Sequence, residues 1–314
     1  MKNAVSNFKK AISINPNFVF AHNNLGNAYK DLGKFKDAYN KYEETIKLKP
    51  DYAEAYYNQG CLHRDNFKYN EAKEKFEKAI EIKPDYFDAY INLGFVLRNI
   101  GKLNEAIKNY HKTISLKSDY LEAYSNILFT LFYSEKNEAE YSTSQLKKYR
   151  SALNLINTKL IKKYKYEKNP SRLKIGFISG DFKEHPVGYF LLNTLKNLKK
   201  KKLELVAYSN AAEKDNLTLD LKSQFNNWTQ IEKLNDKEVI NQIREDGIHI
   251  LFDLSGHSAK NRLPIFINKP APIQATWAGY AGSTGIPEID YIVGDSFVTP
   301  IKEKGPFVEK NHWK

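Results

Sequence analysis

The 314-residue sequence contains a single cysteine, Cys61, and a single methionine. One cysteine excludes an internal disulfide bond and a cysteine-based zinc cluster. No apolar run reaches the roughly 18 residues that a membrane-spanning helix requires, and the N-terminal residues lack the apolar core of a secretory signal peptide. We therefore expect a protein of a reducing compartment, with cytoplasmic localisation and no membrane association.

Arginine is also scarce, because only six of the 49 basic residues are arginine although the net charge is +12. Arginine is the side chain best suited to bidentate contacts with phosphates and base edges. Most of the lysines alternate with acidic residues, as in Glu71–Lys78, which is typical of a solvated helix surface. No histidine pair has the spacing of zinc ligands on a helix. We therefore expect neither a nucleic-acid partner nor a metal site.

The first part of the sequence repeats itself every 34 residues, which is the period of the tetratricopeptide repeat. The repeated positions are Pro16, Pro50 and Pro84; Gly26, Gly60 and Gly94; Ala38, Ala72 and Ala106; and Tyr42, Phe76 and Tyr110. Small residues let paired helices approach closely, aromatic residues fill the gap between repeats, and proline ends the second helix. Residues 1–133 are therefore predicted to form a superhelix, in which residues 4–16 match only the second helix of the first repeat.

Four asparagines also follow this period, each on the predicted first helix of a unit. They are Asn24, Asn58, Asn92 and Asn126. First helices line the concave face of such a superhelix, so these amides would form a row there. An amide both donates and accepts hydrogen bonds, so the row could hold an extended polypeptide backbone without reading its sequence. The alternative is that each asparagine caps or bridges locally.

The pattern changes along the second half of the chain. Residues 134–170 are charged and helix-prone, and we interpret them as a helical connector. Beyond Pro170, strands are predicted at 173–179, 203–209, 248–254, 273–277 and 291–293, and helices at 187–198 and 236–245. Such alternation predicts an α/β lobe with a parallel sheet over residues 171–314. Ligands of such sheets bind at the carboxyl ends of the strands, which directs attention to the loops 180–188, 255–262 and 278–285. Neither a dinucleotide fingerprint nor a phosphate-binding P-loop pattern is present.

Several blocks of this second half carry a resemblance to a known family. They are Leu173–Pro186, Asp246–His257, Asn261–Leu263, Lys269–Gly285 and Asp290–Tyr291. Together with the repeats, they resemble the O-GlcNAc transferases and their SPINDLY-type relatives, which join tetratricopeptide repeats to a two-lobed catalytic region. The resemblance implies a superhelix followed by a Rossmann-like lobe, the first half of a GT-B glycosyltransferase. It also implies transfer of GlcNAc or fucose from a nucleotide-sugar, such as UDP-GlcNAc or GDP-fucose, to serine or threonine of proteins, with no further cofactor.

The resemblance also assigns roles to particular residues. His185 and His249 match two histidines of the family's active site, and either could accept the hydroxyl proton or orient the acceptor. Asp246 would orient His249. The simpler alternatives are a loop residue for His185 and a buried core residue for His249. The row of asparagines would bind the acceptor polypeptide on the concave face.

The same resemblance leads us to expect a second lobe that this chain lacks, and with it most of the contacts to the nucleotide-sugar. Two hypotheses of different classes follow. The chain is part of a protein O-glycosyltransferase, with the second lobe on a separate chain, or it is a truncated, non-catalytic adaptor that binds proteins through its repeats. The block 256–263 favours the SPINDLY-type and bacterial members.

Overall fold

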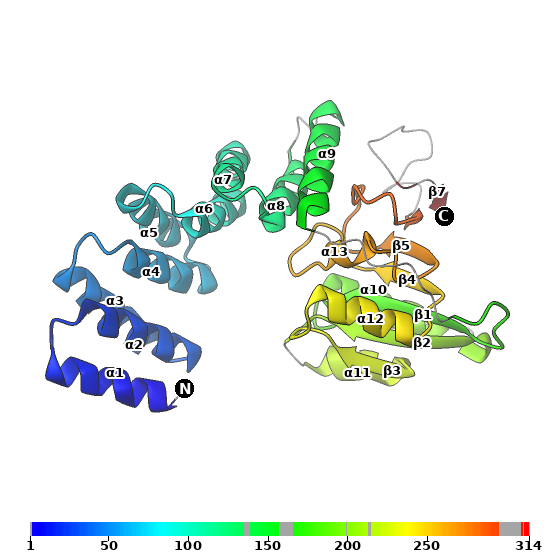
Figure 1. Cartoon of the computed structure of the whole chain (residues 1–314), viewed down its shortest axis with the longest axis horizontal. Helices are drawn as coiled ribbons and strands as arrows, with labels where there is room; N and C mark the ends of the chain where they lie inside the picture. The colour runs from blue at the N-terminus through cyan, green and yellow to red at the C-terminus, as the bar shows by residue number, and fades with distance from the viewer. Residues whose placement is uncertain are drawn as a thin grey trace. The chain divides into compact units, whose positions relative to one another are not determined.

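The computed structural model describes residues 2–134, 139–156, 166–198, 200–212, 215–294, 309 and 311–313. The chain divides into two compact units, Met1–Ser134 and Glu135–Lys314 (Figure 1). The first unit is helical and the second is an α/β lobe. The expected succession of a superhelix and a Rossmann-like lobe is therefore confirmed. Within the described ranges, none of the helices combines the length and the apolar character needed to cross a bilayer.

The first unit is a stack of antiparallel helices that follows the 34-residue period. Its helices are α1 (Lys2–Ile14), α2 (Val19–Asp31), α3 (Phe35–Leu48), α4 (Ala53–Asp65), α5 (Tyr69–Ile82), α6 (Phe87–Asn99), α7 (Leu103–Leu116) and α8 (Leu121–Leu131). The pairs α2–α3, α4–α5 and α6–α7 are the complete repeats, and α1 packs on α2 as the predicted second helix of a partial unit. The first helices α2, α4, α6 and α8 approach one another more closely than the second helices do, so the stack curves towards the first-helix face.

In each complete repeat, a buried aromatic ring of the second helix packs against a glycine of the first helix. The rings of Tyr42, Phe76 and Tyr110 are fully buried, and each lies against the glycine 16 residues before it. A methyl group on Gly94 would lie only 2.5 Å from the ring of Tyr110. The glycines are therefore required by packing, although glycine inside a helix costs about 1 kcal/mol relative to alanine. This confirms the predicted role of the small residues. The aromatic ring packs within its own repeat, and Tyr42 also belongs to one apolar cluster with Ala55 and Leu62 of the next repeat.

The second unit is built on a seven-stranded sheet in the order β3-β2-β1-β4-β5-β6-β7, and every neighbouring pair is parallel. The strands are β1 (Leu173–Ser179), β2 (Leu203–Ser209), β3 (Asn227–Gln230), β4 (Ile250–Asp253), β5 (Ile273–Trp277), β6 (Tyr291–Val293) and β7 (Asn311–Trp313). The strand order reverses direction between β1 and β4, and this switch point is where loops diverge and leave a crevice at the carboxyl ends.

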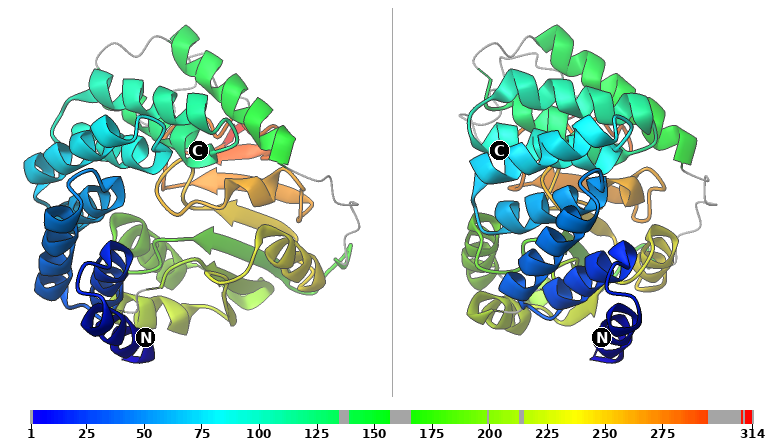
Figure 2. Two further views of the ribbon diagram at one scale, coloured as in Figure 1. Left: turned by 60° about the vertical axis from the view of Figure 1, so that its left-hand side comes forward. Right: turned by 90° about the vertical axis from the view of Figure 1, so that its left-hand side faces the viewer.

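Helices cover both faces of this sheet. The connecting elements are α10 (Pro186–Asn197), a short 3-10 turn at Lys200–Lys202, α11 (Asn216–Gln224), α12 (Asp236–Glu245) and α13 (Leu263–Phe266). Buried side chains of α10 and α11, among them Leu191 and Leu221, pack with Phe177 and Leu205 of the sheet in one apolar core. Helix α12 lies on the opposite face (Figure 2). The lobe is thus a three-layer sandwich, as the strand–helix alternation predicts.

The predicted connector contains α9 (Ala139–Ile156), and this helix belongs to the second unit. Arg150 forms two hydrogen bonds of 2.7 Å with Glu288, and the ring of Tyr149 lies edge-on against His257. Leu146 packs against Gly285. Helix α9 is therefore a part of the lobe rather than a free linker. Residues 157–165 of the connector lie outside the described residues.

Four elements of the lobe, α11, β3, α13 and β7, were not predicted from the sequence. Helix α11 and strand β3 are short, and β3 reads Asn-Trp-Thr-Gln, with no run of apolar residues. They are held by tertiary contacts, since Trp228 packs against Phe182 and the carboxylate of Asp215 caps α11. Strand β4 is also shorter than the predicted 248–254 and covers Ile250–Asp253.

We predict that Gly94→Ala destabilises the first unit. The added methyl group must displace the buried ring of Tyr110, a cost of about 1–3 kcal/mol that exceeds the helix propensity gained. Chemical denaturation followed by far-ultraviolet circular dichroism measures the effect. Lys108→Ala, on the exposed face of α7, is the matched control and should change the unfolding free energy by less than about 0.5 kcal/mol. Equal stability of the two variants would contradict the packing role of the glycine.

Candidate functional site

The loop that follows β1 carries the predicted histidine His185. This residue is the N-cap of α10, and its Nδ1 accepts a hydrogen bond of 3.3 Å from the backbone N–H of Val187. Pro186 occupies the first helical position, where its missing N–H costs nothing. The side chain of His185 is 40% exposed, with Asp181 Oδ2 3.9 Å from Nδ1. His185 is therefore held at the carboxyl edge of the sheet with one ring edge open to solvent.

The carboxylate of Asp181 lies beneath this histidine. Burial raises the pKa of Asp181, and the positive charges of His185, Lys183 and Lys260 oppose that rise. Lys260 comes from the loop after β4, whose backbone packs directly against Gly180. Asp181 and His185 therefore lie together at the edge, and the positive charges of Lys183 and Lys260 act on the same carboxylate.

The loop of His185 is anchored from the side by the start of α11. The carboxylate of Asp215 accepts hydrogen bonds from the backbone N–H of Glu184, at 2.6 Å, and of Thr218, at 2.8 Å. These bonds lower the pKa of Asp215. Thr218 also donates to the carbonyl of Phe182 at 2.8 Å. The loop is thus held at both ends by the rigid helices α10 and α11.

The loops after β4 and β5 are organised by a fully buried carboxylate, Asp253. Its two oxygens accept hydrogen bonds from the backbone N–H groups of Ser255, at 3.1 Å, and Gly256, at 2.8 Å, and from the hydroxyl of Thr276, at 2.9 Å. Burial raises the pKa of Asp253, whereas these three hydrogen bonds lower it. One side chain therefore ties the loop after β4 to the carboxyl end of β5.

Below these loops lies a second buried group, centred on His257. Its Nε2 is 3.0 Å from the carbonyl oxygen of Thr284, and its ring lies edge-on between Tyr149 and Tyr280. Glu309 accepts hydrogen bonds from the backbone N–H and the hydroxyl of Thr284, at 2.8 and 2.7 Å. Burial lowers the pKa of His257 to about 3, so the ring is neutral near pH 7. The glycine-rich loop 278–285 is therefore preformed by contacts from underneath.

The second predicted histidine, His249, lies at the opposite edge of the sheet. It immediately precedes β4, whereas His185 follows β1, and the two strands run parallel. Its Nδ1 accepts a hydrogen bond of 3.1 Å from the backbone N–H of Lys174, and its Nε2 is 2.9 Å from the carbonyl oxygen of Glu167. A strand the length of β1 separates the two edges by roughly 20 Å. The structure therefore does not bring the two histidines together.

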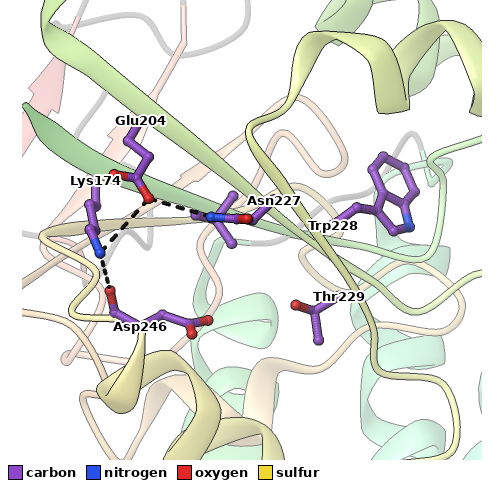
Figure 3. A pocket seen from close by; sticks show the side chains of 7 residues that line it. Lys174, Glu204, Asn227, Trp228, Thr229 and Asp246 are labelled. Carbon is purple, nitrogen blue, oxygen red and sulfur yellow. Dashed lines mark hydrogen bonds and ion pairs between the residues drawn. The ribbon is translucent and has the colours of Figure 1, made fainter.

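Asp246 lies at that same amino edge but serves other partners. Its carboxylate accepts hydrogen bonds from the hydroxyl of Tyr208, at 2.6 Å, and from the amide of Gln242, at 2.8 Å. Asp246 also lines a polar pocket of about 280 Å³, in which Lys174 reaches its carbonyl oxygen (Figure 3). The sequence suggested that Asp246 orients His249. In the structure, backbone groups of Lys174 and Glu167 hold the ring of His249 instead.

The four asparagines of the repeats lie in a row on the first helices, but their amides have partners within the chain. Asn24 donates to the carbonyl of Phe20 in its own helix. Asn58 is buried and donates to Asn23 at 3.1 Å.

The two later asparagines of the row are contacted by arginines of the preceding repeat. Arg64 donates to Asn92 and Arg98 donates to Asn126, at 3.5 Å in the second pair. Local bridging between repeats, the alternative left open by the sequence, is thus present at three of these positions. Asn92 and Asn126 remain partly exposed.

No metal site is evident in the described ranges, which contain no group of three or more histidine, cysteine or acidic side chains arranged around a common point. The roles of Asp253, His257, Asp215 and Glu309 were missed at the level of sequence. Only Asp253 had a visible signal, since it ends a predicted strand before a Ser-Gly pair. The others act through partners 25 to 31 positions away.

Comparison with known proteins places these loops in context. The family model described as Glycosyl transferase family 41 matches residues 136–313. Tetratricopeptide repeat models match residues 1–33, 26–66, 53–86 and 75–108. The repeats are a protein-interaction module, and the matched family region covers α9 together with the whole sheet.

Curated relatives and one solved structure agree with this match. SPINDLY of Arabidopsis thaliana, a probable UDP-N-acetylglucosamine--peptide N-acetylglucosaminyltransferase, is 36% identical over 148 residues, which cover 46% of this chain and 16% of that protein. The corresponding protein of Hordeum vulgare is 40% identical over 128 residues, covering 40% and 14%. A mutant O-GlcNAc transferase of Thermobaculum terrenum superposes with a TM-score of 0.82 at 29% identity, over 93% of this chain and 56% of that one. The matched stretch thus spans about a sixth of the curated relatives.

The buried, neutral state of His257 predicts a pH dependence of stability. Its pKa is lowered from 6.5 to about 3 in the folded protein, so the unfolded chain binds the extra proton between these values. The contribution of neutral His257 to the free energy of unfolding is therefore complete above pH 6.5. It falls as the pH is lowered towards 3, by up to about 1.4 kcal/mol per pH unit. Thermal unfolding between pH 4 and 8 measures it.

His257→Gln provides the comparison, because Gln can still donate to the carbonyl of Thr284 but does not titrate. The difference between the two proteins isolates His257. Asp253, whose raised pKa has the opposite effect because it favours the folded state at low pH, is present in both. Parallel pH profiles for the two proteins would show that His257 is not a buried neutral group.

Proposed function

Since the chain belongs to glycosyl transferase family 41, we propose that it contributes the acceptor side of a protein O-glycosyltransferase. The enzyme moves a sugar from a nucleotide-sugar to the hydroxyl group of serine or threonine in a polypeptide. The observation that carries this proposal is the family match over residues 136–313, which contains every loop of the carboxyl edge described above. The names of the relatives point to UDP-N-acetylglucosamine as the donor, and GDP-fucose is the second donor to be tested.

In this proposal, His185 acts first as a hydrogen-bond donor. Its Nδ1 accepts from Val187, so in the neutral ring the proton is on Nε2. An Nε2–H group at this edge can orient an acceptor hydroxyl or stabilise charge on a departing oxygen. To accept a proton, Nδ1 must release Val187, and the nearby carboxylate of Asp181 then stabilises the cation.

The lysines of the same edge have a complementary role. Departure of a nucleoside diphosphate builds negative charge, which nearby cations stabilise in a poorly solvated site. Lys183 and Lys260 lie close enough to Asp181 to oppose the rise in its pKa, so their positive charge reaches the point where the two loops meet. We assign them to the stabilisation of that charge.

The repeats hold the acceptor polypeptide along their first-helix face. The stack curves towards this face, and Asn92 and Asn126 are partly exposed on it. Arg98 occupies the carbonyl oxygen of Asn126, so the N–H groups of this amide can donate to a polypeptide carbonyl. The N–H groups of Asn92 already donate to the hydroxyl of Tyr57 and the carbonyl of Asp88. Acceptor binding and sugar transfer are then divided between the two units of the chain.

We predict that His185→Ala lowers sugar transfer by about 100-fold or more, because it removes the only imidazole on the carboxyl edge that is exposed among the described residues. Transfer is measured as incorporation of radiolabelled sugar into serine- and threonine-containing polypeptides, with UDP-GlcNAc and GDP-fucose in parallel. Glu184→Ala is the matched control, since the exposed side chain of this neighbour has no contact in the site.

His249→Gln distinguishes the two edges of the sheet. It should alter stability but leave transfer per folded molecule within about threefold of the wild type, because His249 contacts backbone groups of the amino edge. A loss as large as that of His185→Ala would overturn this assignment. If the folded chain binds polypeptides but neither binds nor uses a donor, the adaptor hypothesis replaces the transferase.

A further inference from the structure

One turn of the repeat unit has a strained backbone and an exposed aromatic side chain. Phe67, between α4 and α5, has a φ of +59°, in the left-handed region that bulky residues rarely adopt. The equivalent positions of the neighbouring repeats are Gly33 and Gly101, with φ of +72° and +82°. Phe67 is 78% exposed, and the space around a Cβ at the two glycines is empty. Folding therefore gains little from this ring in return for the strain.

The ring of Phe67 begins a continuous line of side chains across three repeats. Its centroid is 6.3 Å from that of Tyr69, which is 6.5 Å from that of Phe95. The guanidinium of Arg98 is 5.2 Å from the centroid of Phe95 and 5.0 Å from that of Phe129. Phe129 in turn is 5.5 Å from Tyr133. We call Phe67, Tyr69, Phe95, Arg98, Phe129 and Tyr133 the aromatic stripe.

The aromatic stripe runs beside the row of asparagines. Phe95 and Phe129 lie one helical turn after Asn92 and Asn126, and Arg98 contacts both Phe129 and Asn126. The first complete repeat has Asn27 and the second has Cys61 at the position of Phe95, so the stripe is specific to the later repeats. Phe95, Arg98 and Phe129 lie on the first helices beside the asparagines, whereas Phe67, Tyr69 and Tyr133 follow the ends of α4 and α8.

The spacing of the stripe matches one kind of ligand. Successive side chains on the same side of an extended polypeptide are about 6.5 Å apart, and neighbouring members of the stripe are 5.0 to 6.5 Å apart. Aromatic rings bind the faces of proline and aliphatic side chains, while amide groups bind the backbone between them.

We propose that the aromatic stripe binds an extended polypeptide with proline or aliphatic side chains at alternate positions, and thereby selects the acceptor. The proposal rests on the acceptor-binding role of the repeats given above. It explains the strain at Phe67, because a residue that costs stability and is exposed is retained for a contact outside the chain.

Phe67→Gly tests the proposal sharply, because it removes the ring and relieves the strain together. The variant should unfold at a temperature roughly 3–6 °C higher than the wild type. It should also bind a fluorescein-labelled peptide with the sequence Pro-Ser-Val-Thr, repeated three times, about three- to tenfold more weakly in fluorescence anisotropy. A gain in stability with a loss of binding cannot result from misfolding.

Three comparisons complete the experiment. Phe95→Asn, which introduces the residue of the first repeat, should weaken binding similarly, and Leu48→Ala, an exposed residue at the end of α3, should not. A Gly-Ser-Gly-Thr peptide of equal length should bind weakly and equally to all variants. Unchanged binding of the Pro-Ser-Val-Thr peptide by Phe67→Gly, or tighter binding of single-stranded oligo(dT) than of this peptide, would overturn the proposal. Peptide binding that depends on Phe67 without any sugar transfer would reject the transferase and leave the stripe in place.

Discussion

The buried carboxylate of Asp253 is the interaction on which the candidate site depends. A carboxylate without solvent is costly unless hydrogen bonds compensate, and here two donors from the loop after β4 and one from strand β5 provide them. Their convergence on one side chain holds the backbone that follows β4 against the carboxyl end of β5. His257 then packs beneath both loops, and α9 packs on His257 through Tyr149. The edge of the sheet is therefore shaped before any ligand binds, which is what a site for oriented transfer requires.

The repeats follow a different physical rule, because their stability is local and periodic. Each aromatic ring fills the space above a glycine of its own repeat, so the same packing contact recurs in every complete repeat. Regular packing leaves the exposed positions free to vary, and there the repeats differ from one another. Phe67 occupies a turn where its neighbours have glycine, and Phe95 occupies a position where the two preceding repeats have Asn27 and Cys61. A surface of that kind can acquire specificity without disturbing the core.

The two units thus combine a periodic binding surface with a preformed edge of loops. In the proposed function, the repeats bind the acceptor over a long surface, where many weak contacts add up, whereas the lobe places His185 and Asp181 together at one edge of the sheet. This division suits an enzyme that acts on one hydroxyl group within a long polypeptide, because the remote contacts can supply binding energy to the reacting centre.

The sequence by itself determined the 34-residue repeat, the parallel strand–helix lobe and His185 at a strand-to-helix loop, because periodicity and strand ends are local patterns. It also suggested His249, but only the tertiary structure separates the two histidines, since strand direction decides which edge a residue occupies. The short elements α11 and β3 depend on packing by Trp228 and capping by Asp215, which no local pattern reveals. Contacts such as Thr284 with Glu309, or Arg64 with Asn92, join residues 25 and 28 positions apart, and only folding brings such residues together.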